Sequence, residues 1–253
     1  MKIIRFQYKN KEQYGWVHDE EVGLIEGDLF SEFRRIETEF QINRVNLLTP
    51  VTPEKIICVA RNYEEHVQEH KVETPEYPMI FLKPPSALIS NGESIRIPPQ
   101  SQQVEHEAEL AVVIGKPGKW IEPVDVSNHI LGYTIANDVT ARDLQYKDGQ
   151  WTRAKGFDTF CPLGPWIETE IDPSDLMITC RVNGELRQMS STKEMIFPIN
   201  QLVSYISTIM TLKAGDVILT GTPAGVDRLE SGDVVEISIE GIGALVNPVI
   251  GSK

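Results

Sequence analysis

Short hydrophobic runs alternate with polar and Gly- or Pro-rich stretches along most of this chain, and the pattern predicts a largely β protein. From Ile56 onward the runs are spaced like the strands of a sheet that curls on itself. The strands expected there are Ile56–Val59, Met79–Leu82, Leu110–Ile114, Ile130–Ala136, Leu176–Val182, Val217–Leu219 and Val234–Ile239.

Residues 1–50 have a different texture and predict a small N-terminal α/β module. A short amphipathic stretch, Phe30–Phe40, is expected to be helical. Pro50-Val-Thr-Pro53 marks a boundary, so a second domain should cover residues 54–253. The strands expected in the module are Lys2–Phe6, Tyr14–His18 and Val22–Ile25, with Asp19-Glu20 as the turn between the last two.

Two longer helices are expected among the strands, over Asn62–Lys71 and Ile199–Thr211. The second has apolar residues at helical spacing. In the first, Asn62 can serve as the N-cap, and Glu65 follows three residues later as in a capping box. The fold class that we expect is therefore α+β and mostly β.

Composition and charge narrow the class of protein. The chain has 253 residues with 41% hydrophobic and 24% charged, which is ordinary for a globular protein of one large domain or one plus a small appendage. Its net charge of −13 argues against nucleic acid and anionic membrane surfaces as partners. No apolar run approaches the ~20 residues that cross a bilayer, and the N-terminus has no signal-peptide core. Cys58, Cys161 and Cys180 lack metal-ligand spacing and fit the reduced thiols of a cytoplasmic protein.

The segment Glu105-His-Glu-Ala-Glu-Leu110 concentrates carboxylates at the start of an apolar strand. On one continuous strand Glu105, Glu107 and Glu109 would point to the same side, where they repel each other and resist burial. A divalent cation with oxygen ligands would compensate, and Asp138, after another buried-looking strand, would add a third ligand to Glu107 and Glu109. The alternative is a solvated strand face at a sheet edge.

His66 and Glu69 lie three residues apart on the first expected helix and so share a face. A carboxylate beside an imidazole orients the ring and raises its basicity, as a general base requires. One alternative is a surface ion pair. Another is a zinc peptidase site, because His66-Val-Gln-Glu-His70 matches the H-x-x-E-H pattern.

Arg142 and Gln145 follow Asp138 by four and seven residues, so they can face the same site from one side of a helix. The alternative for Arg142 is a salt bridge to Asp138 or Asp143. Lys155 is flanked by Ala, Gly and aromatic residues, which is unusual for a solvated lysine, and it could bind a carboxylate or an enolate oxygen.

The segment Leu219-Thr-Gly-Thr222-Pro-Ala-Gly225 reads as a strand that leads into a Gly-rich loop. Such a loop presents backbone N–H groups and one hydroxyl, that of Thr222, to an anion. It is not a Walker A loop, because the required G-K-[ST] ending is missing.

Together these segments resemble the fumarylacetoacetate hydrolase family. The blocks occur in family order from about Ile56 to the C-terminus, and residues 1–50 are similar to the variable N-terminal module of bacterial members. The matching blocks are Ala60-Arg-Asn-Tyr63 with His66 and Glu69, Phe81-Leu-Lys-Pro-Pro-Ser-Ala87, Glu107-Ala-Glu-Leu-Ala-Val-Val-Ile-Gly115, Asn137-Asp-Val-Thr-Ala-Arg-Asp-Leu-Gln145, Lys155-Gly-Phe-Asp-Thr-Phe160 and Thr220-Gly-Thr-Pro-Ala-Gly225.

The resemblance implies a mixed β-sandwich roll, usually a homodimer, with Mg²⁺ or Mn²⁺ (Ca²⁺ as a substitute) on Glu107, Glu109 and Asp138. Glu105 is left as an outer or surface carboxylate. His66 and Glu69 become a dyad that activates water or transfers a proton, on a segment that closes over the substrate. The other site residues that the resemblance implies are Lys155, as a catalytic residue, and Arg61, Lys83, Arg142, Gln145 and Thr222, as substrate contacts.

The implied reaction is cleavage next to a small anionic 2-oxo acid, with a pyruvate enolate stabilised by the metal. Arg61-Asn-Tyr63, Trp151-Thr152 and Ala154-Lys155 resemble the branch of acylpyruvate hydrolases and oxaloacetate decarboxylases. One alternative is an isomerase or decarboxylase of 2-oxo-hept-ene-dioates in aromatic catabolism. An alternative of another class is a non-catalytic module that binds a metal or a 2-oxo acid.

Overall fold

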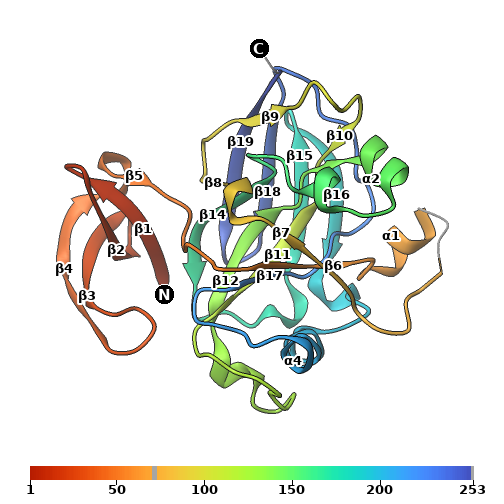
Figure 1. Ribbon diagram of the computed structural model, residues 1–253. Coiled ribbons are helices and arrows are strands. Elements are labelled where there is room, and N and C mark those ends of the chain that lie inside the picture. The colour runs from red at the N-terminus through yellow and green to blue at the C-terminus, as the bar shows by residue number, and fades with distance from the viewer. Residues whose placement is uncertain (70–72, 252–253) are drawn as a thin grey trace.

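The computed structural model describes residues 1–69 and 73–251, and strands dominate it (Figure 1). Strands make up 44% and helices 18%, which confirms the mostly-β fold class. The strands of the largest sheet are β1 (Lys2–Tyr8), β2 (Lys11–His18), β3 (Glu21–Gly27), β4 (Phe33–Gln41), β5 (Asn46–Leu47), β6 (Ile56–Ala60), β7 (Met79–Lys83), β8 (Leu88–Ile89), β11 (Ala108–Ile114), β12 (Ile130–Asn137), β14 (Cys161–Glu168) and β17 (Val217–Leu219).

This sheet runs in the order β4-β3-β2-β1-β14-β12-β11-β17-β6-β7, with β5 beside β1 and β8 beside β14. A second sheet has the order β16-β15-β18-β19-β9, and β10 pairs with β13 in a short ribbon. The strands of these two sheets are β9 (Ile95–Ile97), β10 (Val104–Glu105), β13 (Thr140–Ala141), β15 (Met177–Val182), β16 (Glu185–Ser191), β18 (Val234–Ile239) and β19 (Gly243–Gly251).

The central strand β11 is covered on both faces, and all of its residues are buried. Leu110 packs in one cluster with Ile178 and Ile237 of the second sheet. Ala111, on the opposite face of the strand, packs in another cluster with Leu163 of β14. A carboxylate on this strand is therefore far from bulk water, and it must find its partners inside the protein.

The helices are few and short, and within the described residues none is long and apolar enough to cross a bilayer. The expected helix over Ile199–Thr211 is confirmed as α4. The helix expected over Asn62–Lys71 begins two residues later than expected, at Glu64, and its predicted residues 70 and 71 lie outside the described part of the chain. The α-helices are α1 (Glu64–Glu69), α2 (Arg142–Asp148), α3 (Thr152–Lys155) and α4 (Ile199–Ile209), and short 3-10 helices cover Ile42–Arg44, Pro85–Ala87, Val126–His129, Pro173–Asp175 and Thr192–Glu194.

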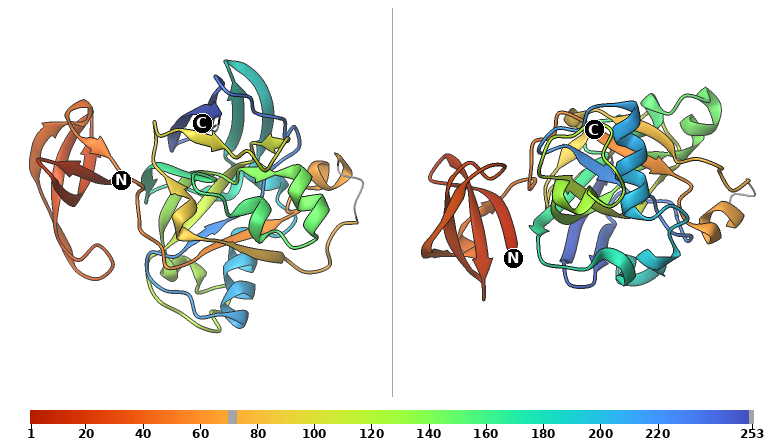
Figure 2. Two further views of the ribbon diagram at one scale, coloured as in Figure 1. Left: turned by 45° about the horizontal axis from the view of Figure 1, so that its top comes forward. Right: turned by 90° about the horizontal axis from the view of Figure 1, so that it is seen from below.

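The N-terminal strands lie to one side of the rest of the chain in every view (Figures 1 and 2). Their backbone joins the large sheet where β1 pairs with β14, through Lys2 opposite Glu168 and Ile3 opposite Ile167. The expected strands and the turn at Asp19-Glu20 are confirmed, since β2 and β3 form a hairpin around it.

The expected helix over Phe30–Phe40 is wrong, because this segment forms β4. Its pairing with β3 shifts register at two places around Gly23, and these irregularities break the two-residue alternation of a regular strand. The apolar residues therefore fall at intervals that imitate a helix. Trp16 also donates its indole N–H to the carbonyl of Ile36 at 2.8 Å, a sideways contact that helps to hold the segment extended.

Candidate active site

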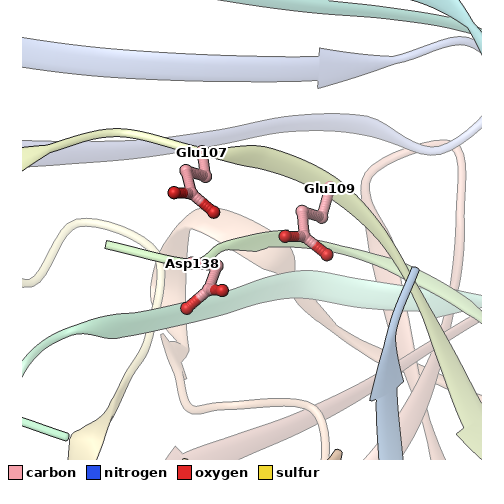
Figure 3. Close-up of side chains that lie close together, drawn as sticks. All are labelled: Glu107, Glu109 and Asp138. Atoms are coloured by element: carbon pink, nitrogen blue, oxygen red, sulfur yellow. The ribbon is translucent and has the colours of Figure 1, made fainter. Parts of the chain in front are cut away.

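Three carboxylates converge at the buried end of the β11–β12 pair (Figure 3). Glu107 immediately precedes β11, Glu109 lies on it, and Asp138 immediately follows β12. Asp138 donates its backbone N–H to the carbonyl of Glu107 at 2.9 Å, which holds the two chain segments together. One oxygen of each carboxylate lies within 4.8 Å of the others, and all three residues are buried. The sequence prediction of this trio as one cluster agrees with the geometry.

Two buried lysines neutralise one side of the cluster. Lys155 Nζ lies 2.8 Å from Glu107 Oε2 and 2.6 Å from Asp138 Oδ2. Lys83 Nζ lies 2.6 Å from Asp138 Oδ1 and donates also to the carbonyl of Val139. Burial lowers the pKa of Lys155, but the charges of Asp138 and Glu107 outweigh it and leave the pKa raised. Lys155 therefore stays a cation in the site.

Arg142 connects the cluster to Glu105. Its Nε lies 2.7 Å from Glu105 Oε2, its Nη2 lies 2.5 Å from Glu107 Oε1, and its Nη1 donates to Gln145 Oε1 at 2.6 Å. The alternative partners Asp138 and Asp143 are therefore wrong for Arg142. The expected continuous strand is wrong as well, because β10 ends at Glu105 and two residues intervene before β11. The break turns Glu105 toward Arg142, buried behind the cluster and away from the surface.

Glu109 differs from Glu107 in its electrostatics. Within the described residues no lysine, arginine or histidine pairs with it, and its Oε2 accepts only the backbone N–H of Gly221, at 2.6 Å. Burial raises its pKa well above the ordinary range, and the charges of Asp138 and Glu107 raise it further. Burial also raises the pKa of Glu107, but Lys155 and Arg142 outweigh it and leave that pKa lowered.

A hard divalent cation fits this set of donors. Within the described residues, the buried carboxylates Glu105, Glu107 and Asp138 pair with lysine or arginine side chains, and Glu109 does not, so the charge that Glu109 carries when it is ionised is left for a bound cation to compensate. All the candidate ligand atoms are carboxylate oxygens, which Mg²⁺, Mn²⁺ and Ca²⁺ prefer and zinc does not.

The loop after β17 approaches the carboxylates through Gly221. This residue has φ +99°, and a Cβ there would come within 2.7 Å of the Asn62 Cβ, so only glycine fits without strain. Asn62 does not cap α1 as expected. Its side chain donates to the carbonyls of Phe197 and Thr220 and accepts from Phe197 N–H, which ties the start of the α1 segment to the loop.

His66 and Glu69 face each other on α1, with Nδ1 and Oε2 3.4 Å apart. The Glu69 carboxylate also accepts the backbone N–H of Gly225, at 3.2 Å and 3.3 Å. His66 is buried, while Glu69 is partly open to solvent. His70, the second histidine of the zinc peptidase alternative, lies outside the described residues.

A cavity of about 150 Å³ brings most of the predicted residues together. Lys83 and Glu69 do not line it but contact lining residues from behind, Asp138 and His66 respectively. Sequence reasoning assigned no role to Phe81, although it is two residues from Lys83 on β7 and so shares its face. The predicted residues that line the cavity are Arg61, His66, Glu107, Glu109, Asp138, Arg142, Gln145, Lys155 and Thr222, and Phe81, Tyr146 and Trp151 complete its aromatic wall.

Comparison with known proteins identifies the family. A family profile described as "Fumarylacetoacetate (FAA) hydrolase C-terminal" matches residues 55–250. The chain belongs to the fumarylacetoacetate hydrolase family. A second profile, described as "Rv2993c-like, N-terminal", matches residues 1–50.

Relatives within this family include protein MJ1656 of Methanocaldococcus jannaschii, 59% identical over 79% of this chain and 84% of that protein. The oxaloacetate tautomerase Fahd2a, mitochondrial, of Rattus norvegicus is 46% identical over 82% of this chain and 70% of that protein. The crystal structure of 5-carboxymethyl-2-hydroxymuconate delta-isomerase from Mycobacterium smegmatis superimposes with a TM-score of 0.93 and 44% identity over the whole of both chains. The relatives named for an activity are thus enzymes, a tautomerase and an isomerase.

Proposed function

We propose that this chain is a Mg²⁺- or Mn²⁺-dependent enzyme that acts on oxaloacetate and related small 2-oxo acids at the carbon next to the 2-oxo group. The observation that carries the proposal is the buried trio Glu107, Glu109 and Asp138, at the floor of a small cavity that Arg142 and Lys155 also line. A site of this size and charge suits a small chelating anion rather than a peptide. The oxaloacetate tautomerase named above supports oxaloacetate as the first substrate to test.

Glu107, Glu109 and Asp138 would hold the metal, which supplies Lewis-acid polarisation of the substrate oxygens when it is bound. Lys155 and Arg142 place two fixed positive charges where negative charge develops as the substrate becomes an enolate. Such fixed charges stabilise the enolate without rearranging, because both side chains are already held by carboxylates.

We assign proton transfer at the substrate carbon to His66, and the assignment is supported by its position in the cavity wall with Glu69 beside its Nδ1. A neighbouring carboxylate favours the charged form of an imidazole and orients the ring. For a keto–enol conversion the dyad would need only to take and return one proton. Decarboxylation of oxaloacetate would instead form the enolate of pyruvate as CO₂ leaves, and the dyad would then return a proton to its C3 carbon.

A second candidate is hydrolysis of acylpyruvates, favoured specifically by the contact of Glu69 with His66. A carboxylate-supported imidazole can deprotonate water for attack on the distal carbonyl, which would release pyruvate and a carboxylic acid. A further alternative is isomerisation of a 2-oxo-hept-ene-dioate, which would also proceed through an enolate. The similarity to the delta-isomerase named above supports it.

The test is an assay of the chelator-treated protein, with and without added Mg²⁺ or Mn²⁺, against oxaloacetate, acetylpyruvate and a 2-oxo-hept-3-ene-dioate. Enol–keto conversion, CO₂ release and pyruvate formation are followed separately. Metal-dependent turnover of any of them supports the proposal, and the product identifies the reaction. Binding of metal without turnover of any substrate would instead support the non-catalytic module, and zinc with peptide cleavage would support the peptidase.

We further propose that the enzyme is a cytoplasmic homodimer. The three cysteines are free and buried, which accords with a reducing compartment. Light scattering after size exclusion tests the dimer, which a single species at 28.5 kDa would contradict.

A further inference from the structure

The edge strand β16 buries an amide and exposes its apolar residues. Gln188 is 0% exposed, whereas Leu186 is 45% and Met189 is 60% exposed. This reverses the usual preference, in which apolar side chains go inside. A buried amide is retained where its hydrogen bonds are made, so the partners of Gln188 explain its place in the core.

Gln188 reaches two parts of the active site at once. Its Oε1 accepts the backbone N–H of Ala108 at 3.1 Å and lies 2.9 Å from His106 Nδ1. Its Nε2 donates to the carbonyl of Pro223 and to Thr222 Oγ1, both at 2.8 Å. A backbone N–H can only donate and a backbone carbonyl can only accept, so Ala108 and Pro223 allow the amide one orientation.

This orientation fixes the polarity of the Thr222 hydroxyl. Because Thr222 Oγ1 accepts from Gln188, its own hydrogen is left to donate to another acceptor. No residue in the described part of the chain is hydrogen-bonded to that hydrogen, and Thr222 lines the cavity. Building on the proposed function, we propose that Gln188 is a positioning residue that fixes Thr222 as a hydrogen-bond donor to an anionic oxygen of the substrate.

The Gln188 side chain also links the loop at residues 220–225 to the strand that carries the carboxylates. Ala108 lies between Glu107 and Glu109, so its bond to Gln188 anchors the ligand strand to β16. The loop itself presses on β16, because a Cβ on Gly225 would come within 2.2 Å of the Arg187 carbonyl oxygen. Loss of the amide should therefore loosen the loop as well as free the hydroxyl to turn.

The test compares Gln188→Met, Thr222→Val and the double variant, in the full chain loaded with Mn²⁺ and titrated with oxalate by calorimetry. Asn247→Leu is the control, because Asn247 is an equally buried amide that donates to two carbonyls, those of Ser90 and Glu93, outside the cavity. Gln188→Met and Thr222→Val should each weaken oxalate binding by about tenfold or more, as expected for the loss of a hydrogen bond to a charged group. Both substitutions remove the same contact, so their effects should not add. The affinity of the double variant for oxalate should therefore lie within about threefold of that of the weaker-binding single variant. The control should stay within about threefold of the parent.

Hydrogen exchange of the backbone in residues 220–225 gives a readout that needs no substrate. Exchange there should rise at least about tenfold in Gln188→Met and stay at the parent rate in Asn247→Leu. Parent affinity for oxalate in folded Gln188→Met, or additive losses in the double variant, would overturn the proposal. If the parent protein binds no oxalate and turns over no 2-oxo acid, the proposed function fails, and hydrogen exchange alone then decides whether Gln188 positions the loop.

Discussion

The floor of the cavity and the α1 segment beside it are built in different ways. The floor is buried, and two of its carboxylates, Glu107 and Asp138, form short ion pairs with lysine and arginine side chains. The α1 helix has six residues, its His66 and Glu69 pair with each other, and Glu69 accepts the backbone N–H of Gly225. Under the proposed function, the floor would hold the metal and the substrate in fixed geometry, and α1 would bring the proton-transfer group.

Removing the metal should have the largest effect, because it acts on the floor as a whole. Chelation should reduce turnover of the accepted 2-oxo acid by about 10⁴-fold or more, since Lewis-acid stabilisation is worth several kcal/mol and each ~1.4 kcal/mol is a factor of ten. Added Mg²⁺ or Mn²⁺ should restore it, as measured by initial rates after dialysis. Full activity in the metal-free protein would contradict the assignment of the floor.

Proton transfer and metal binding should separate when α1 is changed. His66→Ala should lower turnover by about 10²- to 10⁴-fold, the usual contribution of a general acid–base group. Metal affinity, measured by calorimetry, should remain that of the parent, because His66 is not in the carboxylate trio. Glu107→Ala is the matched comparison on the floor, and it should lose the metal as well as the activity. An unchanged rate in His66→Ala would refute the dyad.

Within the floor, substitutions of Asp138 and of Glu109 should have different effects on the stability of the protein. Asp138→Ala leaves Lys83 without its carboxylate and Lys155 with one fewer, and breaking a buried pair costs about 3–5 kcal/mol. Glu109→Gln replaces a buried carboxyl group, which has no lysine or arginine partner among the described residues, with a neutral amide of the same size, so stability should be unchanged or higher. Both variants should bind metal at least about tenfold more weakly. Urea unfolding of the metal-free proteins tests the contrast, and equal destabilisation would refute it.

The raised pKa of Glu109 predicts that metal binding is coupled to protons. In the metal-free protein burial and the neighbouring carboxylates favour the protonated form, and a metal ligand must be deprotonated. Binding should therefore release protons, and affinity should rise with pH up to the pKa of the folded protein. The sign for stability is opposite: a carboxyl whose folded pKa is raised favours folding below its unfolded pKa, and this contribution is lost as pH rises toward the folded pKa. Calorimetry in two buffers of different ionisation enthalpy measures the proton release, and Glu109→Gln should lack it.

The sequence predicted strands well where a short apolar run stands between polar or Gly- and Pro-rich stretches, as in β11, β12 and β15. It did not predict β14, because Pro162, Gly164 and Pro165 interrupt Cys161–Glu168 in the way that usually marks a loop. The protein tolerates them because tertiary packing supplies the order that local preference does not: Cys161 and Leu163 are fully buried. The false helix over Phe30–Phe40 has a similar cause in the irregular pairing of β4.

At the site, the local sequence predicted which residues gather there, but it did not predict which side chains they contact. The spacing of Glu107 and Glu109 and the position of Asp138 after a strand pointed to one cluster. The alternation of side chains along a continuous strand could not distinguish Glu105 from Glu107 and Glu109. The strand breaks at residues 106–107, and no two-residue pattern predicts that break. Gln188 gave no signal at all, since its role depends on β16 packing against a loop 34 residues away.

Among the substitutions of buried carboxylates, Glu105→Gln should have the smallest effect on metal affinity. It tests whether the metal site is limited to the carboxylates of the floor. The substituted amide can still accept from Arg142 Nε through its oxygen, and Arg142 keeps its ion pair with Glu107. Metal affinity should stay within about threefold of the parent, and stability should fall by about 1–2 kcal/mol, the value of a buried charge-assisted contact weakened but not removed. Calorimetry and urea unfolding measure the two. A loss of metal as large as in Glu107→Ala would mean that the floor extends to Glu105, and that Arg142 depends on it for its position beside Glu107.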